Sequence, residues 1–136
     1  MLRQRSSLLV ILPLIAVLLL GAAGLEEQYR RHHALILRAE TLTGGNVKRG
    51  SRLFVAYGCG GCHSLGGVPG ARGQVGPRLD GVGAQVIIAG RLANNPTNMM
   101  RWIGDPQGVS PGTAMPNLGV TSAQQRDIAA LLYSRS

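Results

Sequence analysis

Residues 58–63 read Gly-Cys-Gly-Gly-Cys-His, and the order of cysteines and histidine in this stretch decides the fold. Cys59 and Cys62 are separated by two residues, and His63 follows directly. This pattern is typical of the covalent attachment of a c-type haem. Each thiol would add to a different vinyl group, and the adjacent imidazole would bind the iron. Gly60 and Gly61 fill the two intervening positions, where we expect a tight, strained backbone that is easier to form without Cβ.

Two other interpretations of a Cys-x-x-Cys pair are a redox dithiol and one half of a zinc site. A zinc site usually needs a second pair of ligands, and the chain has only 2 cysteines. A thioredoxin-like dithiol needs a βαβ context, and nothing in the sequence indicates one. Haem attachment is therefore the favoured interpretation, and a dithiol stays the alternative.

A methionine opposite the histidine is the axial ligand that raises the potential of electron-transfer haems. Of the 4 methionines, Met1 is the start, and Met99 and Met100 lie in an expected helix where they fill hydrophobic space. Met115 instead lies in an irregular stretch between Pro111 and Pro116. Prolines lower the entropic cost of holding such a loop over a flat cofactor. Met115 is therefore the expected sixth ligand.

The segment from about residue 47 to 134 resembles a class I cytochrome c domain. The matching positions are Gly50, Phe54, Cys59, Cys62, His63, Gly76, Pro77, Met115 and Pro116. The resemblance implies an all-α fold with one covalent haem c, with His63 and Met115 as the metal ligands. It also implies that Gly50 and Phe54 pack against the C-terminal helix. The Pro77 carbonyl is expected to accept the His63 Nδ1–H, a bond that fixes the imidazole tautomer.

Within that family, the chain is most similar to the cytochrome c domain of caa3-type haem–copper oxidases. Residues 88–96 and 102–107 carry this likeness, which covers roughly two thirds of the chain, and no copper-site motif is present. Leu131 departs from the family, which often has an aromatic residue there, so the helix contact around it could be rearranged. The resemblance also places Trp102 near a haem propionate. Arg91 is a further candidate to pair with a propionate, with a solvated side chain as the alternative.

Residues 8–25 are uncharged and apolar, interrupted only by Pro13. Eighteen helical residues span about 27 Å, close to the thickness of the hydrocarbon layer. We favour a membrane anchor over residues 1–25, with a secretory signal that ends near Gly21-Ala22-Ala23 as the alternative. Residues 26–46 are expected to continue this helix as a juxtamembrane segment and linker that ends at Gly44-Gly45, and residues 47–136 to form the cytochrome domain.

The formal net charge is +8. Only Arg3 and Arg5 of the 14 basic residues precede residue 26, so the outer part is basic as well. A basic rim would steer a redox partner with an acidic face, whereas nucleic acid is not an expected partner. His32 and His33 are expected to lie in an exposed basic stretch near lipid headgroups rather than to ligate a metal.

Local signals predict three helices in the outer domain. Asn46 is expected to cap a helix over 47–57, and Asn95-Pro96 to begin one that ends near Ile103. Thr121 and Gln124 form a capping box before a helix whose apolar stripe is Ile128, Leu131 and Leu132. The run Val86–Ile88 is too short to predict a sheet.

Together these features predict a membrane-anchored electron carrier, not an enzyme, in a respiratory chain. The resemblance places the haem domain outside the cytoplasmic membrane of a bacterium, on the periplasmic side of a single span. A terminal oxidase or another respiratory complex is the expected partner. Alternatives are the electron-accepting subunit of a periplasmic dehydrogenase, a haem sensor or enzyme with an open sixth position, and an assembly element with a structural haem.

Overall fold

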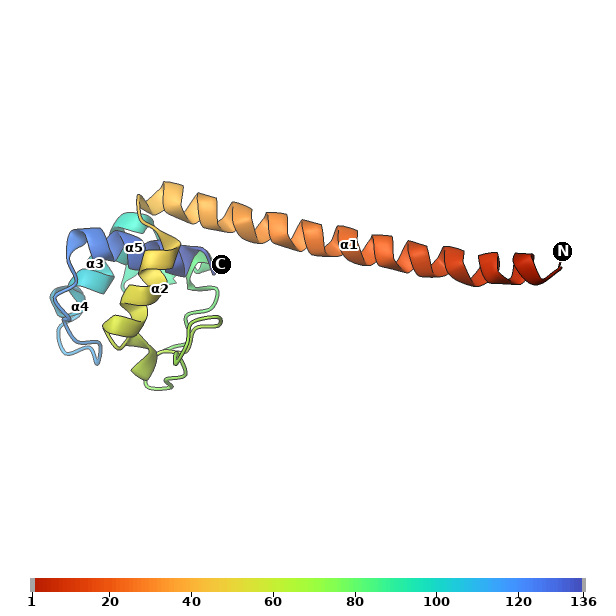
Figure 1. Ribbon diagram of the computed structural model, residues 1–136. Helices are drawn as coiled ribbons and strands as arrows, with labels where there is room; N and C mark the ends of the chain where they lie inside the picture. Colours follow the sequence, from red (N-terminus) through yellow and green to blue (C-terminus); the bar gives the residue numbers. More distant parts are fainter. Residues whose placement is uncertain (1, 136) are drawn as a thin grey trace. The chain divides into compact units, whose positions relative to one another are not determined.

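A computed structural model describes the backbone of residues 2–135 and the side chains of residues 11–135. Helices make up most of the described chain, which confirms the all-α prediction (Figure 1). The chain divides into two compact units, with the boundary between Ala34 and Leu35. From Leu2 on, the first unit is helical, and the second unit holds all the remaining described elements.

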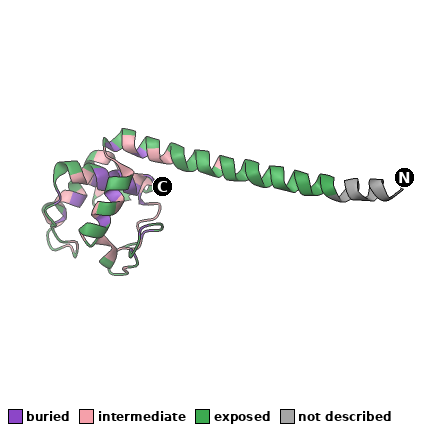
Figure 2. Ribbon diagram, in the orientation of Figure 1, coloured by how far each residue is buried: buried purple, intermediate pink, exposed green. Residues whose placement is uncertain are grey.

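The first helix, α1, spans Leu2–Thr43 and contains Pro13. It is continuous through the apolar and polar segments, as predicted. Residues 11–25 are all exposed (Figure 2), and Ile11–Thr43 is long and apolar enough to cross a membrane by length and composition. Beyond the apolar stretch, Glu27 pairs with Arg30 and Arg31 at 2.9 and 2.6 Å. Such pairs support an exposed helix only weakly.

The C-terminal end of α1 belongs to the second unit, where Ala39 and Thr43 are buried. The helix ends at the predicted glycine pair because Gly44 adopts a left-handed φ of 66°. Gly45 then lies so close to α5 (Ser122–Tyr133) that a Cβ there would meet the Arg126 carbonyl oxygen at 2.1 Å. The turn between α1 and the next helix therefore depends on both glycines, each for a different reason.

The helix α2 spans Val47–Ala56, and Asn46 caps it by accepting from the Arg49 N–H, as predicted. Asp127 of α5 accepts from the Asn46 N–H at 2.7 Å and from the Arg49 guanidinium at 2.9 Å. Burial opposes ionisation of Asp127, but the Arg49 and Asn46 hydrogen bonds outweigh it and hold the pKa of this carboxyl below its usual value. This contact ties the start of α2 to α5.

The crossing of α2 and α5 forms the centre of the core (Figure 1). A Cβ at Gly50 would lie 2.0 Å from the Asp127 carbonyl oxygen and 3.1 Å from the Leu131 Cβ. Phe54 and Leu131 are almost completely buried there. The helix contact expected from Gly50 and Phe54 is thus present. Leu131 fills the position where the family often has an aromatic residue, and the Tyr133 hydroxyl donates to Asn94 at 2.6 Å.

The remaining helices are short. Asn95 caps α3 (Pro96–Gly104), and α4 (Pro106–Val109) follows directly. Thr121 and Gln124 form the predicted capping box of α5. Met99 is buried in the core and Met100 is half-buried at its edge, in agreement with their expected packing role.

One correction concerns the run Val86–Ile88, for which no strand was predicted. Ile87–Ile88 (β1) pairs antiparallel with Leu92–Ala93 (β2) in a minimal hairpin. Its turn is closed by the Arg91 N–H, which donates to the Ile88 carbonyl. Ala89 and Gly90 at the centre of the turn have φ values of 51° and 67°. Ala89 tolerates φ > 0 poorly, so the sequence carries no strong turn signal and the hairpin escaped prediction.

Candidate functional site

The Cys-x-x-Cys-His stretch folds into one tight turn. Gly58 enters it with a left-handed φ of 69°, and Cys59–Gly61 forms the short 3-10 helix η1. The backbone N–H groups of Cys62 and His63 both donate to the Cys59 carbonyl, at 3.2 and 2.9 Å. Both thiols are free, with Cys59 half-buried and Cys62 exposed. The turn thus fixes two thiols and an imidazole to one short piece of backbone.

Burial gives the two thiols different environments. Desolvation is the largest effect on Cys59 and raises the pKa of its thiol. Cys59 also packs against the edge of the hydrophobic core, beside which Met100 and Trp102 lie half-buried. An apolar, partly covered thiol next to an exposed one suits covalent attachment of a largely apolar group.

The histidine is oriented by the segment that follows the loop. The His63 Nδ1 lies 2.8 Å from the Pro77 carbonyl oxygen, which is the contact that the resemblance implied. Since that oxygen only accepts, the contact requires the proton on Nδ1, and Nε2 is the ring nitrogen that a metal would use. The backbone N–H of Gly76 donates to the Cys62 carbonyl at 2.8 Å and holds this segment against the motif.

Gly76 makes this approach possible. A Cβ at position 76 would lie 2.3 Å from His63 Cε1 and 2.6 Å from Nδ1. These distances are too short for a real side chain, so the backbone lies directly against the imidazole ring. Gly76 was noted in the sequence only as part of the Gly-Pro match, and its steric role comes from the structure.

Two further glycines pack the loop on the motif, and sequence reasoning missed or misjudged them. A Cβ at Gly73 would meet the Cys62 carbonyl carbon at 2.3 Å, and one at Gly60 would meet the Ala71 Cα at 2.8 Å. Gly60 and Gly61 were expected to relieve backbone strain, but neither has a positive φ. Gly60 is needed for the close approach of Ala71, whereas a Cβ at Gly61 would meet open space.

Met115 lies half-buried in the irregular stretch between α4 and α5. Its backbone carbonyl accepts from the Gln107 Nε2 at 2.8 Å, and the Thr113 carbonyl accepts from the same nitrogen at 2.7 Å. The Gly112 N–H donates to Gln107 Oε1 at 3.2 Å. One side chain of α4 therefore holds three points of the loop that carries Met115. From the sequence, Gln107 was noted only as the last residue of the stretch 102–107 and was given no role.

A second contact secures the same loop from its far end. Asn117 accepts from the Gln107 backbone N–H at 3.2 Å and donates to Asp105 at 2.9 Å. Asp105 also accepts from the Gly108 N–H and caps α4. The Gly108 bond, followed by the Asn117 bond, lowers the pKa of Asp105. The loop is thus held to α4 at residues on both sides of Met115.

The two remaining candidates come from other elements than the turn. Trp102 is half-buried on α3, and Arg91 is exposed in the β1–β2 hairpin. Among residues 11–135, no hydrogen bond or ion pair joins Trp102, Arg91 or Met115 to the Cys59–His63 turn. Their roles toward a haem stay predictions. In the same part of the chain, no three His, Cys, Asp or Glu side chains gather into a group that could hold a metal ion.

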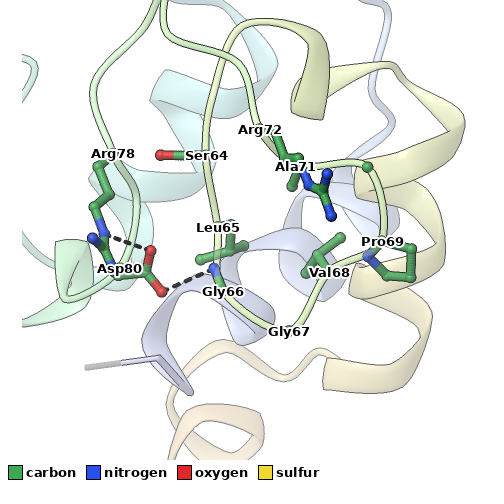
Figure 3. A pocket seen from close by; sticks show the side chains of 11 residues that line it. Ser64, Leu65, Gly66, Gly67, Val68, Pro69, Ala71, Arg72, Arg78 and Asp80 are labelled. Atoms are coloured by element: carbon green, nitrogen blue, oxygen red, sulfur yellow. Dashed lines mark hydrogen bonds and ion pairs between the residues drawn. The ribbon is translucent and has the colours of Figure 1, made fainter.

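An open pocket lies over the loop that follows the motif, lined by residues 64–72 with Arg78 and Asp80 (Figure 3). Arg78 pairs with Asp80 at 2.8 Å, and Asp80 accepts from the Gly66 N–H at 2.9 Å. The Gly66 bond is also the largest effect that lowers the pKa of Asp80. None of the cysteines, His63 or Met115 lines this pocket, so it is not where the cofactor is expected.

Comparisons with known proteins give the sequence relatives of this chain. A sequence model of the family described as Cytochrome c matches residues 47–136. The chain is 37% identical over 91 residues to a protein of Alkalihalophilus pseudofirmus named cytochrome c oxidase subunit 2. This match covers 66% of the present chain and 25% of the relative, so the chain spans about a quarter of that protein's length. No solved structure matches significantly.

Proposed function

Because this chain belongs to the cytochrome c family, we propose that it carries single electrons by means of one haem c held between His63 and Met115. Membership of this family implies that the cofactor is haem c and that the protein carries electrons. The finer proposal is carried by a single observation, the 2.8 Å contact between His63 Nδ1 and the Pro77 carbonyl. It leaves the other imidazole nitrogen free to bind iron.

The residues present fit a covalently bound haem. Cys59 and Cys62 supply two free thiols within one turn, and each would form a thioether to one vinyl group. Gly76 leaves no space for a side chain beside His63, so the backbone forms a cradle that holds the ring in place. When bound, haem c supplies an iron that changes its oxidation state by one electron.

The protein's own residues would hold the iron in one ligand arrangement while its oxidation state changes. The Pro77 carbonyl holds the His63 proton on Nδ1 and makes the imidazole a stronger ligand. Met115 would fill the sixth position with a neutral thioether, which favours the reduced state more than a second nitrogen would. An iron held by both His63 and Met115 would offer no place for a substrate, so we propose no catalytic residue.

We further propose that α1 anchors the protein in the cytoplasmic membrane of a bacterium, with the cytochrome domain on the periplasmic or outer side. The exposed apolar residues from Ile11 to Leu25 support the anchor. The named relative supports a terminal oxidase as electron acceptor or host assembly. Co-purification from membranes, followed by identification of the companions, tests this partner against a periplasmic dehydrogenase.

Carbon monoxide binding tests the proposed ligation. The reduced wild-type protein is expected to resist carbon monoxide because Met115 occupies the sixth position, and Met115→Ala is expected to bind it rapidly. Met99→Ala is the matched control, since Met99 is buried in the core. Rapid binding by the wild type would contradict the proposal and favour a sensor or enzyme with an open position.

Salt dependence tests the mode of partner contact. The +8 formal charge, which two haem propionates would reduce, is expected to speed encounter with an acidic partner. Electron transfer should therefore slow as ionic strength rises. A rate that does not change with salt would contradict steering and would suit a permanently docked subunit.

A further inference from the structure

We propose that Gln107 is a positioning residue that holds Met115 in place as a ligand. The inference rests on the proposed function, because it takes Met115 as the sixth ligand. It begins from the hydrogen-bond arrangement around one amide. The Nε2 group has two hydrogens, and both are used, one on the Thr113 carbonyl at 2.7 Å and one on the Met115 carbonyl at 2.8 Å.

The same amide is fixed at its oxygen. Gln107 Oε1 accepts from the Gly112 N–H at 3.2 Å, and this contact sets which end of the amide faces the two carbonyls. An amide placed the other way would set an oxygen against two carbonyl oxygens. The orientation of Gln107 is therefore determined by its neighbours, and the loop is held in one arrangement.

The base of this arrangement is buried and hydrogen-bonded. Pro106, which precedes Gln107, is almost completely buried and attaches α4 to the core. Asp105 caps α4 and also accepts from Asn117, beyond Met115. The Met115 loop has no helix or strand of its own, so these side-chain contacts take the place of a regular backbone ladder.

A loop held in this way limits how often Met115 leaves the iron. Each neutral hydrogen bond contributes roughly a factor of 5 to an equilibrium constant, so losing two should raise the open population about 10- to 30-fold. Carbon monoxide reaches the reduced iron only when Met115 is displaced. Its binding rate therefore reports this population directly.

The test uses the full-length holoprotein with Gln107→Glu, which keeps the shape and the accepting oxygen but replaces the donor by an oxygen that faces two carbonyls. Gln125→Glu is the matched control, because the Gln125 Nε2 donates to a single carbonyl, that of Val120, at 2.8 Å. It introduces the same charge on α5, and it contacts the stretch between α4 and α5 only at Val120, beyond the Gly112–Asn117 segment that Gln107 holds. Gln107→Ala repeats the test without a charge if Gln107→Glu does not accumulate with haem.

We expect Gln107→Glu to bind carbon monoxide at least about 10-fold faster and to lose intensity in the sulfur-to-iron absorption band of the ferric form. Gln125→Glu should leave both readouts near wild type. A purely structural role would lower stability to denaturant in both variants without selective loss of the band.

Two results would overturn the inference, and they are distinguishable. If the wild type shows the sulfur-to-iron band and Gln107→Glu keeps it with an unchanged carbon monoxide rate, the role of Gln107 is wrong and the ligation by Met115 stands. If the wild type lacks the band and Met115→Ala behaves like wild type, the proposed ligation fails and the role of Gln107 fails with it.

Discussion

Replacing Gly76 by alanine is expected to damage the candidate site although the residue lies thirteen positions beyond His63 and carries no side chain. The added Cβ would lie 2.3 Å from His63 Cε1 and 2.6 Å from Nδ1. Ordinary contacts between carbon atoms are about 3.5–4.0 Å, so the ring or the 76–77 backbone must move by roughly 1 Å. The His63–Pro77 contact cannot absorb that movement, because it begins at 2.8 Å and ceases to be a hydrogen bond near 3.5 Å.

The size of the effect follows from that lost bond. Partners that orient a metal ligand typically contribute 10–100-fold to metal affinity, equal to about 1.4–2.7 kcal/mol. The imidazole also becomes a weaker donor, which destabilises the oxidised iron more than the reduced iron. At about 59 mV per tenfold change for one electron, a differential effect of roughly 1 kcal/mol raises the potential by about 40 mV.

Spectroelectrochemistry and haem content per chain measure both consequences. Gly61→Ala is the matched control, because Gly61 lies inside the attachment motif, yet a Cβ there meets open space and its φ is not positive. We expect Gly61→Ala to behave like wild type. A Gly76→Ala protein with full haem content and a potential within about 10 mV of wild type would refute the reasoning.

Three further predictions concern the core and the unloaded motif. Gly50→Ala should lower the free energy of unfolding in urea by about 1–2 kcal/mol, since overpacking against a backbone carbonyl outweighs a gain of about 1 kcal/mol in helix propensity. Arg52→Ala on the same helix is the control and should change this free energy by less than about 0.5 kcal/mol. Equal effects of the two substitutions would contradict the close crossing of α2 and α5. Because hydrogen bonds to Asp127 hold the pKa of this carboxyl below its ordinary value, the stability that Asp127 contributes to the fold is fully present above about pH 4 and is lost as pH falls through the folded pKa. The free energy of unfolding, measured at a series of pH values, should therefore fall less steeply in acid for Asp127→Asn than for the wild type. Parallel curves for the two proteins would count against this. In the haem-free chain, alkylation followed by peptide mapping should find Cys62 modified before Cys59, because Cys62 is exposed while burial raises the pKa of the Cys59 thiol. Equal alkylation rates for the two thiols would show that the motif is not folded as described.

Features that depend on residues close in sequence were predictable. The caps at Asn46, Asn95 and Thr121 each bind a backbone N–H three residues ahead, so their signals lie within one turn of helix. The attachment motif is equally local. The contact of His63 with Pro77 spans 14 residues and came from a family resemblance rather than from the residues themselves.

Features that depend on how distant segments meet were not predictable. Gly60 was expected to relieve strain, but its requirement comes from Ala71, which the fold brings against it. The role of Gln107 could not be predicted from its position on α4, because it depends on contacts with the loop from Gly112 to Asn117, which the fold brings back to it. The hairpin at Ile87–Ala93 needed a non-glycine residue at positive φ, which sequence patterns disfavour.

Mass spectrometry of the denatured, acid–acetone-extracted polypeptide tests the central claim most directly. The account predicts one haem per chain that survives extraction, with peptide fragmentation placing a thioether on both Cys59 and Cys62. A polypeptide that emerges at its unmodified mass, with all of the chromophore in the acetone, would contradict it.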